Sequence, residues 1–173
     1  MAVSLYDLSV ATYVQVLGGL EGVLGRGLTH FQENKTDPNE VLEARLYTDM
    51  LPFRVQVLVT AHHSLGAIRG IEAGLFQPPG QLPALDYAGL QKTVTETREA
   101  LQKLAPADVN AHEGKDVVFQ IRDTNIPFRA EDFVMSFSLP NFYFHATTAY
   151  DILRHKGVPL GKRDFLGRMR LKT

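Results

Sequence analysis

The chain has 173 residues, with 18 basic and 19 acidic side chains, a net charge of -1 and no cysteine. This length suits one domain with a sizeable core, and the balanced charge lacks the basic footprint of a nucleic-acid-binding protein. The absence of cysteine excludes disulfides, thiolate metal sites and cysteine nucleophiles. We therefore expect a single domain over residues 1–173, without a nucleic-acid partner.

The N-terminal segment predicts a long first helix. Ser4 and Asp7 have the spacing of a variant capping box, and leucines and Tyr13 recur behind it every three to four residues. The pattern predicts a helix over residues 5–30, whose glycines allow a neighbour to approach closely. The segment has no basic stretch of signal-peptide type and no run of about 18 apolar residues. We expect a cytoplasmic protein without a membrane partner.

Two further helices follow in the middle of the chain. A polar loop over residues 33–39 and a short helix over residues 40–46 precede Pro52, which fits the first turn of the second helix. Apolar residues from Val55 to Ile68 form its buried stripe, and Gly74 fits its C-cap. The Pro-rich residues 77–83 break the chain. A third helix then begins at Asp86 or Tyr87 and ends before Pro106.

The last third of the chain combines two β-rich segments with a fourth helix. Residues 117–121 and 133–137 carry the aromatic and β-branched residues typical of strands. The segment between them lacks a two-residue hairpin signature. A helix over residues 140–156 and a basic tail follow, and Phe165 is expected to anchor the first half of that tail. We predict an all-α, up-down four-helix bundle with a small two-stranded insertion before the last helix.

The fourth helix carries polar groups on one arc of a mostly apolar surface. Because a helix advances about 100° per residue, Asn141, His145 and Thr148 share one side and Asp151 lies beside His155. Burying such groups without partners is unfavourable, so they either bind each other or bind a ligand. Asp151 and His155 equally fit an ordinary surface pair.

The segment Leu139 to Gly167, LPNFYFHATTAYDILRHKGVPLGKRDFLG, resembles a family of bacterial and fungal proteins that carries a domain-of-unknown-function label. SLYDLSVATY and DMLPFRVQV, nearer the N-terminus, share the resemblance, which covers nearly the whole chain. The family is grouped with the DinB/YfiT-like helical bundles. The resemblance implies a four-helix bundle and a homodimer, but the family's label names no reaction.

The resemblance also implies a divalent metal, commonly zinc or nickel, because many superfamily members hold one with a histidine from helix 2 and two from helix 4. This chain has Asp151 where the second helix 4 histidine would precede His155. If an ion binds, we expect His63 or His62, Asp151 and His155 to hold it. We favour no tightly bound ion, since only one helix 4 histidine matches the pattern.

Two functional hypotheses follow. The first is a small-molecule enzyme or binding protein with its site between helices 2 and 4. Without a metal, His145 or His155 is its acid–base group, assisted by Asp151. The second is a non-catalytic dimeric bundle that binds a ligand or partner.

The first hypothesis places His145 in an internal pocket lined by helices 1 and 2, with Tyr13, Asn141 and Thr148 as ligand-binding residues. A buried neutral histidine bonded to a neighbour is the simpler reading of His145, and a first-turn role is the simpler reading of Asn141.

Overall fold

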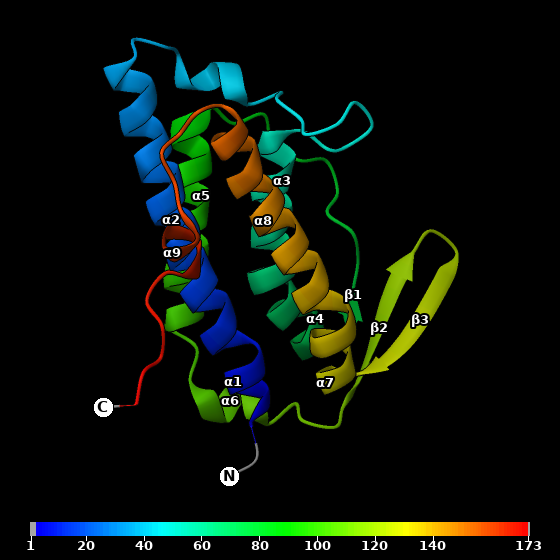
Figure 1. Cartoon of the computed structure of the whole chain (residues 1–173). Coiled ribbons are helices and arrows are strands. Elements are labelled where there is room, and N and C mark those ends of the chain that lie inside the picture. Colours follow the sequence, from blue (N-terminus) through cyan, green and yellow to red (C-terminus); the bar gives the residue numbers. More distant parts are fainter. Residues whose placement is uncertain (1–2, 173) are drawn as a thin grey trace.

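The computed structural model describes residues 3–172, which form a mostly helical domain with a small three-stranded sheet at one side (Figure 1). The α-helices are α1 (Leu5–Leu8), α2 (Val10–Glu33), α3 (Phe53–Ala61), α4 (Ala67–Ala73), α5 (Tyr87–Gln102), α6 (Pro106–Asn110), α7 (Ala130–Asp132), α8 (Leu139–His155) and α9 (Lys162–Leu166). A 3-10 helix, η1 (Pro38–Val41), and two π-helical segments, η2 (His62–Gly66) and η3 (Phe133–Ser138), complete the helical elements. The strands are β1 (Leu75–Phe76), β2 (Asp116–Ile121) and β3 (Thr124–Arg129).

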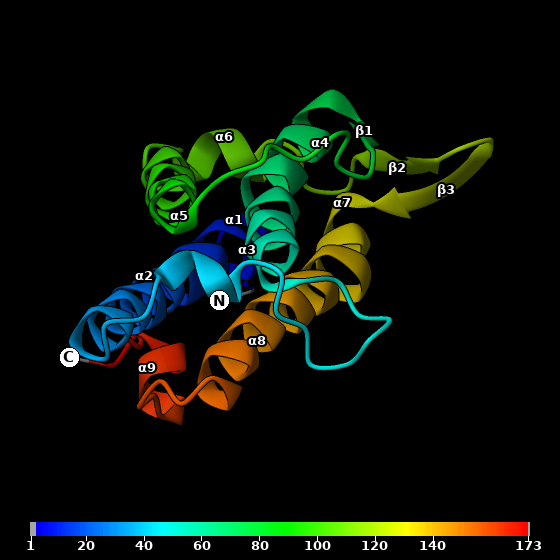
Figure 2. The ribbon, with the colours of Figure 1, turned by 90° about the horizontal axis from the view of Figure 1, so that it is seen from above.

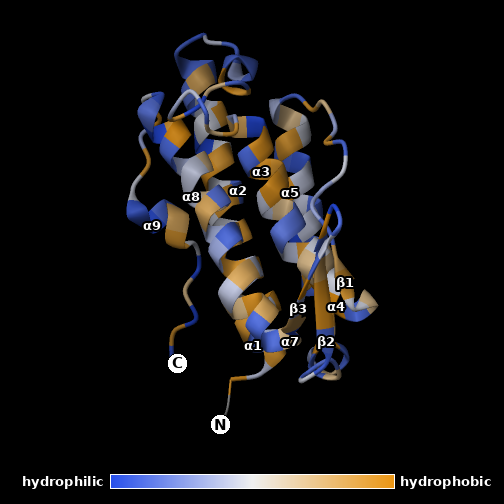
Figure 3. Cartoon of the chain, turned by 90° about the vertical axis from the view of Figure 1, so that its right-hand side faces the viewer, coloured by the Kyte–Doolittle hydropathy of each residue, from blue (hydrophilic) through white to orange (hydrophobic). Residues whose placement is uncertain are grey.

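Four long helical segments enclose the core. α2 packs against α5, and α3 packs against both α8 and α5, which Figure 2 shows from above. α3, η2 and α4 run on without a break, as do α7, η3 and α8. The side chains that these segments bury are mainly apolar. Figure 3 shows that α3 and β2 contain many hydrophobic residues. Burial of apolar side chains, more than helix propensity, stabilises the arrangement.

The first helix matches the sequence prediction closely. The hydroxyl of Ser4 accepts the Asp7 N–H at 3.2 Å, and the Asp7 carboxylate accepts the Ser4 N–H at 3.4 Å, so the capping box forms. The residues Leu5–Glu33 are long and apolar enough to span a membrane by length and composition alone, so the expectation that no apolar run of about 18 residues occurs here was wrong. Half of that apolar window is buried inside the domain, as in a core helix of a helical protein.

Two glycines of α2 accept close neighbours. A Cβ at Gly19 would lie 2.3 Å from the Phe165 carbonyl oxygen of α9, and one at Gly27 would lie 2.4 Å from the Tyr87 hydroxyl of α5. The expectation of close approach is confirmed at these positions. α9 is also held by an ion pair of 3.3 Å between Asp164 and Arg26.

The strand prediction was half right. β2 forms where it was expected, but residues 133–137 are π-helical, and the second strand is β3, inside the segment taken as a linker. β3 contains Pro127, which lacks an N–H and is tolerated because β3 lies at the sheet edge. Two residues form the turn of the hairpin, and Arg122 adopts a φ of 52° there. The dipeptide Arg-Asp is not one of the sequences typical of such a turn. β1 adds a parallel partner to β2.

The remaining boundaries also differ in detail. The predicted short helix over residues 40–46 is a single 3-10 turn at Pro38–Val41, capped by the Asp37 side chain. Gly74 adopts a φ of 70° and caps α4 as expected. Asp86 caps α5, while Pro106 begins α6 after α5 has already ended at Gln102.

Candidate functional site

Two π-helical turns, η2 and η3, meet beside the contact between α3 and α8. A π turn replaces the usual i to i−4 bonding and often marks functional sites. η2 contains His62 and His63, and η3 ends at Ser138, whose hydroxyl donates to the His63 carbonyl at 2.6 Å. Because that hydrogen is already used, Tyr13 must donate its own hydroxyl hydrogen to Ser138, at 2.7 Å. A buried relay from Tyr13 through Ser138 therefore supports the backbone of His63.

The second π turn has a local cause in the sequence. Pro140, in the first turn of α8, has no N–H to donate to the preceding turn. The side-chain amide of Asn141 donates to the Phe137 carbonyl at 2.7 Å and satisfies a carbonyl in this region. Asn141 thus has the first-turn role that was the simpler interpretation of this residue from the sequence. Its ligand-binding role remains a prediction.

His63 lies inside the domain, whereas His62 lies at its edge. The His63 side chain is 6% exposed and packs against Phe76 and Phe137, with ring centroids at 5.4 and 5.6 Å. Its Nδ1 is shielded from solvent and has no hydrogen-bond partner within residues 3–172. Burial, with the neighbouring His62 and His145, lowers the pKa of His63 to about 3. The ring is therefore neutral at pH 7, with one unused nitrogen in the interior.

His62 takes a structural role at the surface. Its Nε2 donates to the Gln77 carbonyl at 2.8 Å, which ties η2 to the segment after β1. The ring also lies against Phe76 at a centroid distance of 4.8 Å. Burial lowers the pKa of His62, and the bond to the Gln77 carbonyl opposes that shift. Of the two adjacent histidines, His63 is the one that points inward.

His145 of α8 faces His63 of η2. The two rings are stacked, with centroids 6.1 Å apart and planes inclined by 15°. His145 is 8% exposed, and burial lowers its pKa to about 4. A pair of neutral imidazoles thus lies between the second and fourth long helical segments.

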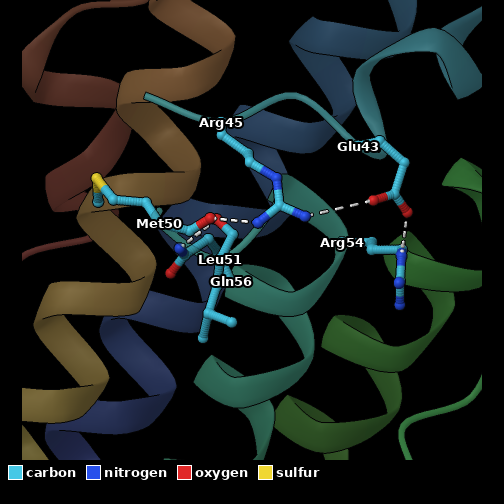
Figure 4. Close-up of polar contacts among 6 residues, drawn as sticks. All are labelled: Glu43, Arg45, Met50, Leu51, Arg54 and Gln56. Carbon is cyan, nitrogen blue, oxygen red and sulfur yellow. Dashed lines mark hydrogen bonds and ion pairs between the residues drawn. The ribbon is translucent and has the colours of Figure 1, made fainter. Parts of the chain in front are cut away.

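Gln56 of α3 fixes the proton position on His145. The Gln56 Nε2 donates to the Leu51 carbonyl at 2.8 Å (Figure 4), so its Oε1 is turned toward His145. That oxygen lies 2.7 Å from His145 Nδ1 and only accepts hydrogen bonds, so Nδ1 carries the proton. Nε2 of His145 then presents a lone pair, the form that a general base or a ligand-accepting imidazole requires.

Ionic contacts hold the loop that carries Leu51. Glu43 pairs with Arg54 of α3 and lies 4.0 Å from Arg45, which also donates to the Met50 carbonyl (Figure 4). These groups are partly exposed, so each pair alone stabilises little. Together they define the position of the Leu51 carbonyl, and through Gln56 the orientation of His145.

The remaining predicted site residues do not join this pair. Tyr13 is fully buried and bonded to Ser138, and the Thr148 hydroxyl donates to the Phe144 carbonyl at 2.7 Å. Asp151 is half-buried near the far end of α8, where burial raises its pKa, and His155 is exposed. No ion pair within 4.0 Å joins Asp151 and His155, although both lie in the described part of the chain.

The metal set suggested by the resemblance is not assembled. Among residues 3–172, no three histidine, aspartate or glutamate side chains lie together in a way that could hold an ion. His63 faces His145, not Asp151 and His155.

Sequence reasoning also missed Gln56, which bonds the His145 ring, and Ser138, which bonds the His63 carbonyl. Gln56 is a buried polar residue in the apolar run of α3, and that mismatch was the available signal.

Comparisons with known proteins agree with this architecture. A solved structure of a DinB family member from Shewanella denitrificans superimposes with a TM-score of 0.84 and 27% sequence identity. The match covers 98% of this chain and 95% of that one. The fold is therefore that of a DinB-like protein. No curated protein matches the sequence.

The family model for the domain of unknown function DUF1993 matches residues 5–166. The chain belongs to this family, as the resemblance of the segment from Leu139 to Gly167 indicated.

Proposed function

We propose that this protein is a DinB-like, up-down four-helix bundle that binds a small molecule between α3–η2 and α8, with His63 and His145 as its working groups. The observation that carries the proposal is the fixed proton position of His145. Gln56 holds Nδ1–H and leaves the Nε2 lone pair free, beside a buried His63 whose Nδ1 has no partner in the described chain. Native proteins seldom leave such atoms unsatisfied, and a ligand that both donates and accepts hydrogen bonds would supply the missing partners.

The chemistry available to this pair is proton transfer and hydrogen bonding. Both imidazoles are neutral at pH 7, since burial lowers the pKa of His145 to about 4. A neutral imidazole accepts an N–H or O–H of a bound molecule, and it removes a proton if that group is acidic enough. We propose His145 as the acceptor and the stacked ring of His63 as the second contact.

A divalent ion does not fit the described residues well. Catalytic zinc sites commonly use three protein ligands, whereas two imidazoles lie together here and no third histidine, aspartate or glutamate joins them in residues 3–172. We therefore derive no step through a metal. Asp151 and His155 form a separate candidate at the far end of α8, to be tested beside the main pair.

The test is a thermal-shift screen of small molecules against wild type and matched variants. Compounds that bind the pair raise the melting temperature of wild type and of Thr147→Leu, which changes an exposed residue of the same helix. The same compounds should not stabilise folded His145→Leu. A compound that raises the melting temperature of His145→Leu by as much as that of wild type, and yet does not raise that of His155→Leu, gives the opposite result. Such a result would place the site at the far end of α8 and contradict the proposal.

A second candidate function, a non-catalytic homodimer, draws on the exposed apolar side chains of η3 and α8. Met135, Tyr143 and Phe144 are 48%, 40% and 55% exposed, and such side chains in soluble proteins often belong to interfaces. Sedimentation equilibrium on wild type and Phe144→Glu tests it. A dimer that dissociates in the variant supports this candidate, and a wild-type monomer at every concentration removes it.

A further inference from the structure

A groove separate from the histidine pair lies between α2, α5 and the chain that follows α9. It encloses about 680 Å³, within the range of small-molecule pockets. The segments that line it, α2, α5 and the C-terminal segment, lie on the side of the molecule away from the β2–β3 hairpin (Figures 1 and 2). No residue that lines it contacts His63 or His145 through a hydrogen bond or ring pair within residues 3–172.

The groove is markedly basic although the chain as a whole carries a net charge of -1. Its lining contains three guanidinium groups, from Arg98, Arg168 and Arg170, and a single carboxylate, from Glu21. The carboxylate forms an ion pair with Arg98, whose Nε lies 2.8 Å from Glu21 Oε2. Arg168 and Arg170 have no ion-pair partner within the described chain. A concave surface with surplus positive charge concentrates anions.

The ion pair at the wall of the groove is incompletely satisfied. Glu21 and Arg98 are only 22% and 26% exposed. Glu21 Oε1 and Arg98 Nε are shielded from solvent and lack a well-aligned hydrogen bond within residues 3–172, although Nε lies close to Oε2. The other guanidinium nitrogens of Arg98 provide further donors, one of which reaches Gln102 at 3.4 Å. The wall therefore has unused capacity for hydrogen bonding.

The chain that supplies Arg168 and Arg170 is tied to α2. Gln15 donates to the Leu166 carbonyl at 3.1 Å. Gly167 follows at a φ of 60°, and a Cβ there would lie 2.8 Å from the Gln15 carbonyl oxygen and 3.0 Å from Gly19 N. Only glycine combines this conformation with this close approach. The two arginines are thus placed at the groove by a tethered segment.

We propose that this groove binds an organic anion, with a phosphate or carboxylate group held by Arg168, Arg170 and Arg98. Guanidinium groups match the planar, bidentate geometry of both anions. Tyr6 and Val14 in the lining provide an apolar surface for the rest of the molecule. The ligand class is a small phosphate ester or a di- or tricarboxylate.

Calorimetric titration with inorganic pyrophosphate and, separately, with citrate tests this proposal at low ionic strength. We expect saturable binding of one equivalent of at least one probe, weakened several-fold by about 0.15 M salt. The probe that binds more tightly identifies phosphate or carboxylate as the preferred group. Lack of saturable binding by both probes would overturn the proposal.

Matched double variants distinguish a built site from diffuse attraction. Arg168→Gln with Arg170→Gln removes two charges from the groove, whereas Arg163→Gln with Lys172→Gln removes two charges from the same region outside it. The groove variant should bind at least ~10-fold more weakly than the control. Gly167→Ala should also weaken binding without changing any charge, because it displaces the segment that carries Arg168 and Arg170. Equal weakening in both double variants would contradict a specific site.

Discussion

The histidine pair makes a prediction about stability that needs no ligand. The perturbation is His145→Leu, measured against wild type from about pH 7 to pH 5, where histidines with ordinary pKa values begin to protonate. Leucine suits the apolar face of α8, but it leaves Gln56 Oε1 without its partner. We expect the variant to fold and to lose about 1–3 kcal/mol of stability at pH 7, the usual cost of one unsatisfied buried polar group.

The difference between the two proteins should shrink as the pH falls. His145 has a folded pKa of about 4, below its unfolded value of 6.5. The unfolded chain therefore takes up a proton that the folded chain does not, and wild type loses stability as the pH falls from 6.5 toward 4. Over the range from about pH 7 to 5 this loss is at most about 2 kcal/mol, and about 1 kcal/mol when solvent screening is allowed for. The variant has no such group at this position.

Urea unfolding monitored by circular dichroism at three pH values provides the assay. Because His63, His62 and the carboxylates are present in both proteins, subtracting the two curves removes most of their contribution. The effect of His145 on the pKa of His63, the smallest of the three causes of that shift, stays in the difference. Burial also raises the pKa of Asp151, which favours the folded state as the pH falls, so the subtraction is essential. A constant difference between wild type and His145→Leu across the range would refute the assignment of a depressed pKa.

Three further predictions concern the surroundings of the pair. Ser138→Ala should destabilise the protein by about 1–3 kcal/mol in chemical unfolding, because it leaves the buried Tyr13 hydroxyl without its partner and removes the hydroxyl donor of the His63 carbonyl. A loss below about 0.5 kcal/mol would show that the relay is unimportant. Gly19→Ala should displace α9, since its Cβ would lie 2.3 Å from the Phe165 carbonyl, and faster proteolysis after α9 than in wild type would reveal this. Protein purified without added metal should contain far less than one equivalent of zinc or nickel by elemental analysis, and stoichiometric metal would overturn our preference.

The long helices were predictable because several of their ends carry a local signature, whereas the short helices α6, α7 and α9 were not predicted. Ser4 and Asp7 begin the first helix, Asp86 caps α5, and Gly74 ends α4, and all three signals act within a few residues. The strand at residues 133–137 was predicted wrongly because composition there favours β structure, while packing against the core and the nearby Pro140 impose a π turn. β3 was missed because Pro127 and the Arg122 turn give no hairpin signal.

The candidate site was predictable in outline and not in detail. His145 was identified as a polar group on an apolar face, and His63 as one of two adjacent histidines, and the structure stacks these two rings. Their partners were not identifiable, because Gln56 and Ser138 reach them across 89 and 75 residues of sequence. Helical periodicity says which residues share a face, and it does not say which face of another helix they will meet.

The central claim is that Gln56 holds the proton on Nδ1 of His145 and leaves Nε2 free for a bound molecule. Long-range proton–nitrogen NMR on wild type measures this directly, with Gln56→Leu as the comparison. The account predicts a neutral ring with an unprotonated Nε2, no protonation above about pH 5, and a mixture of tautomers once Gln56 is replaced. A ring of His145 that carries its proton on Nε2, or that titrates near its ordinary pKa of about 6.5, would contradict the account.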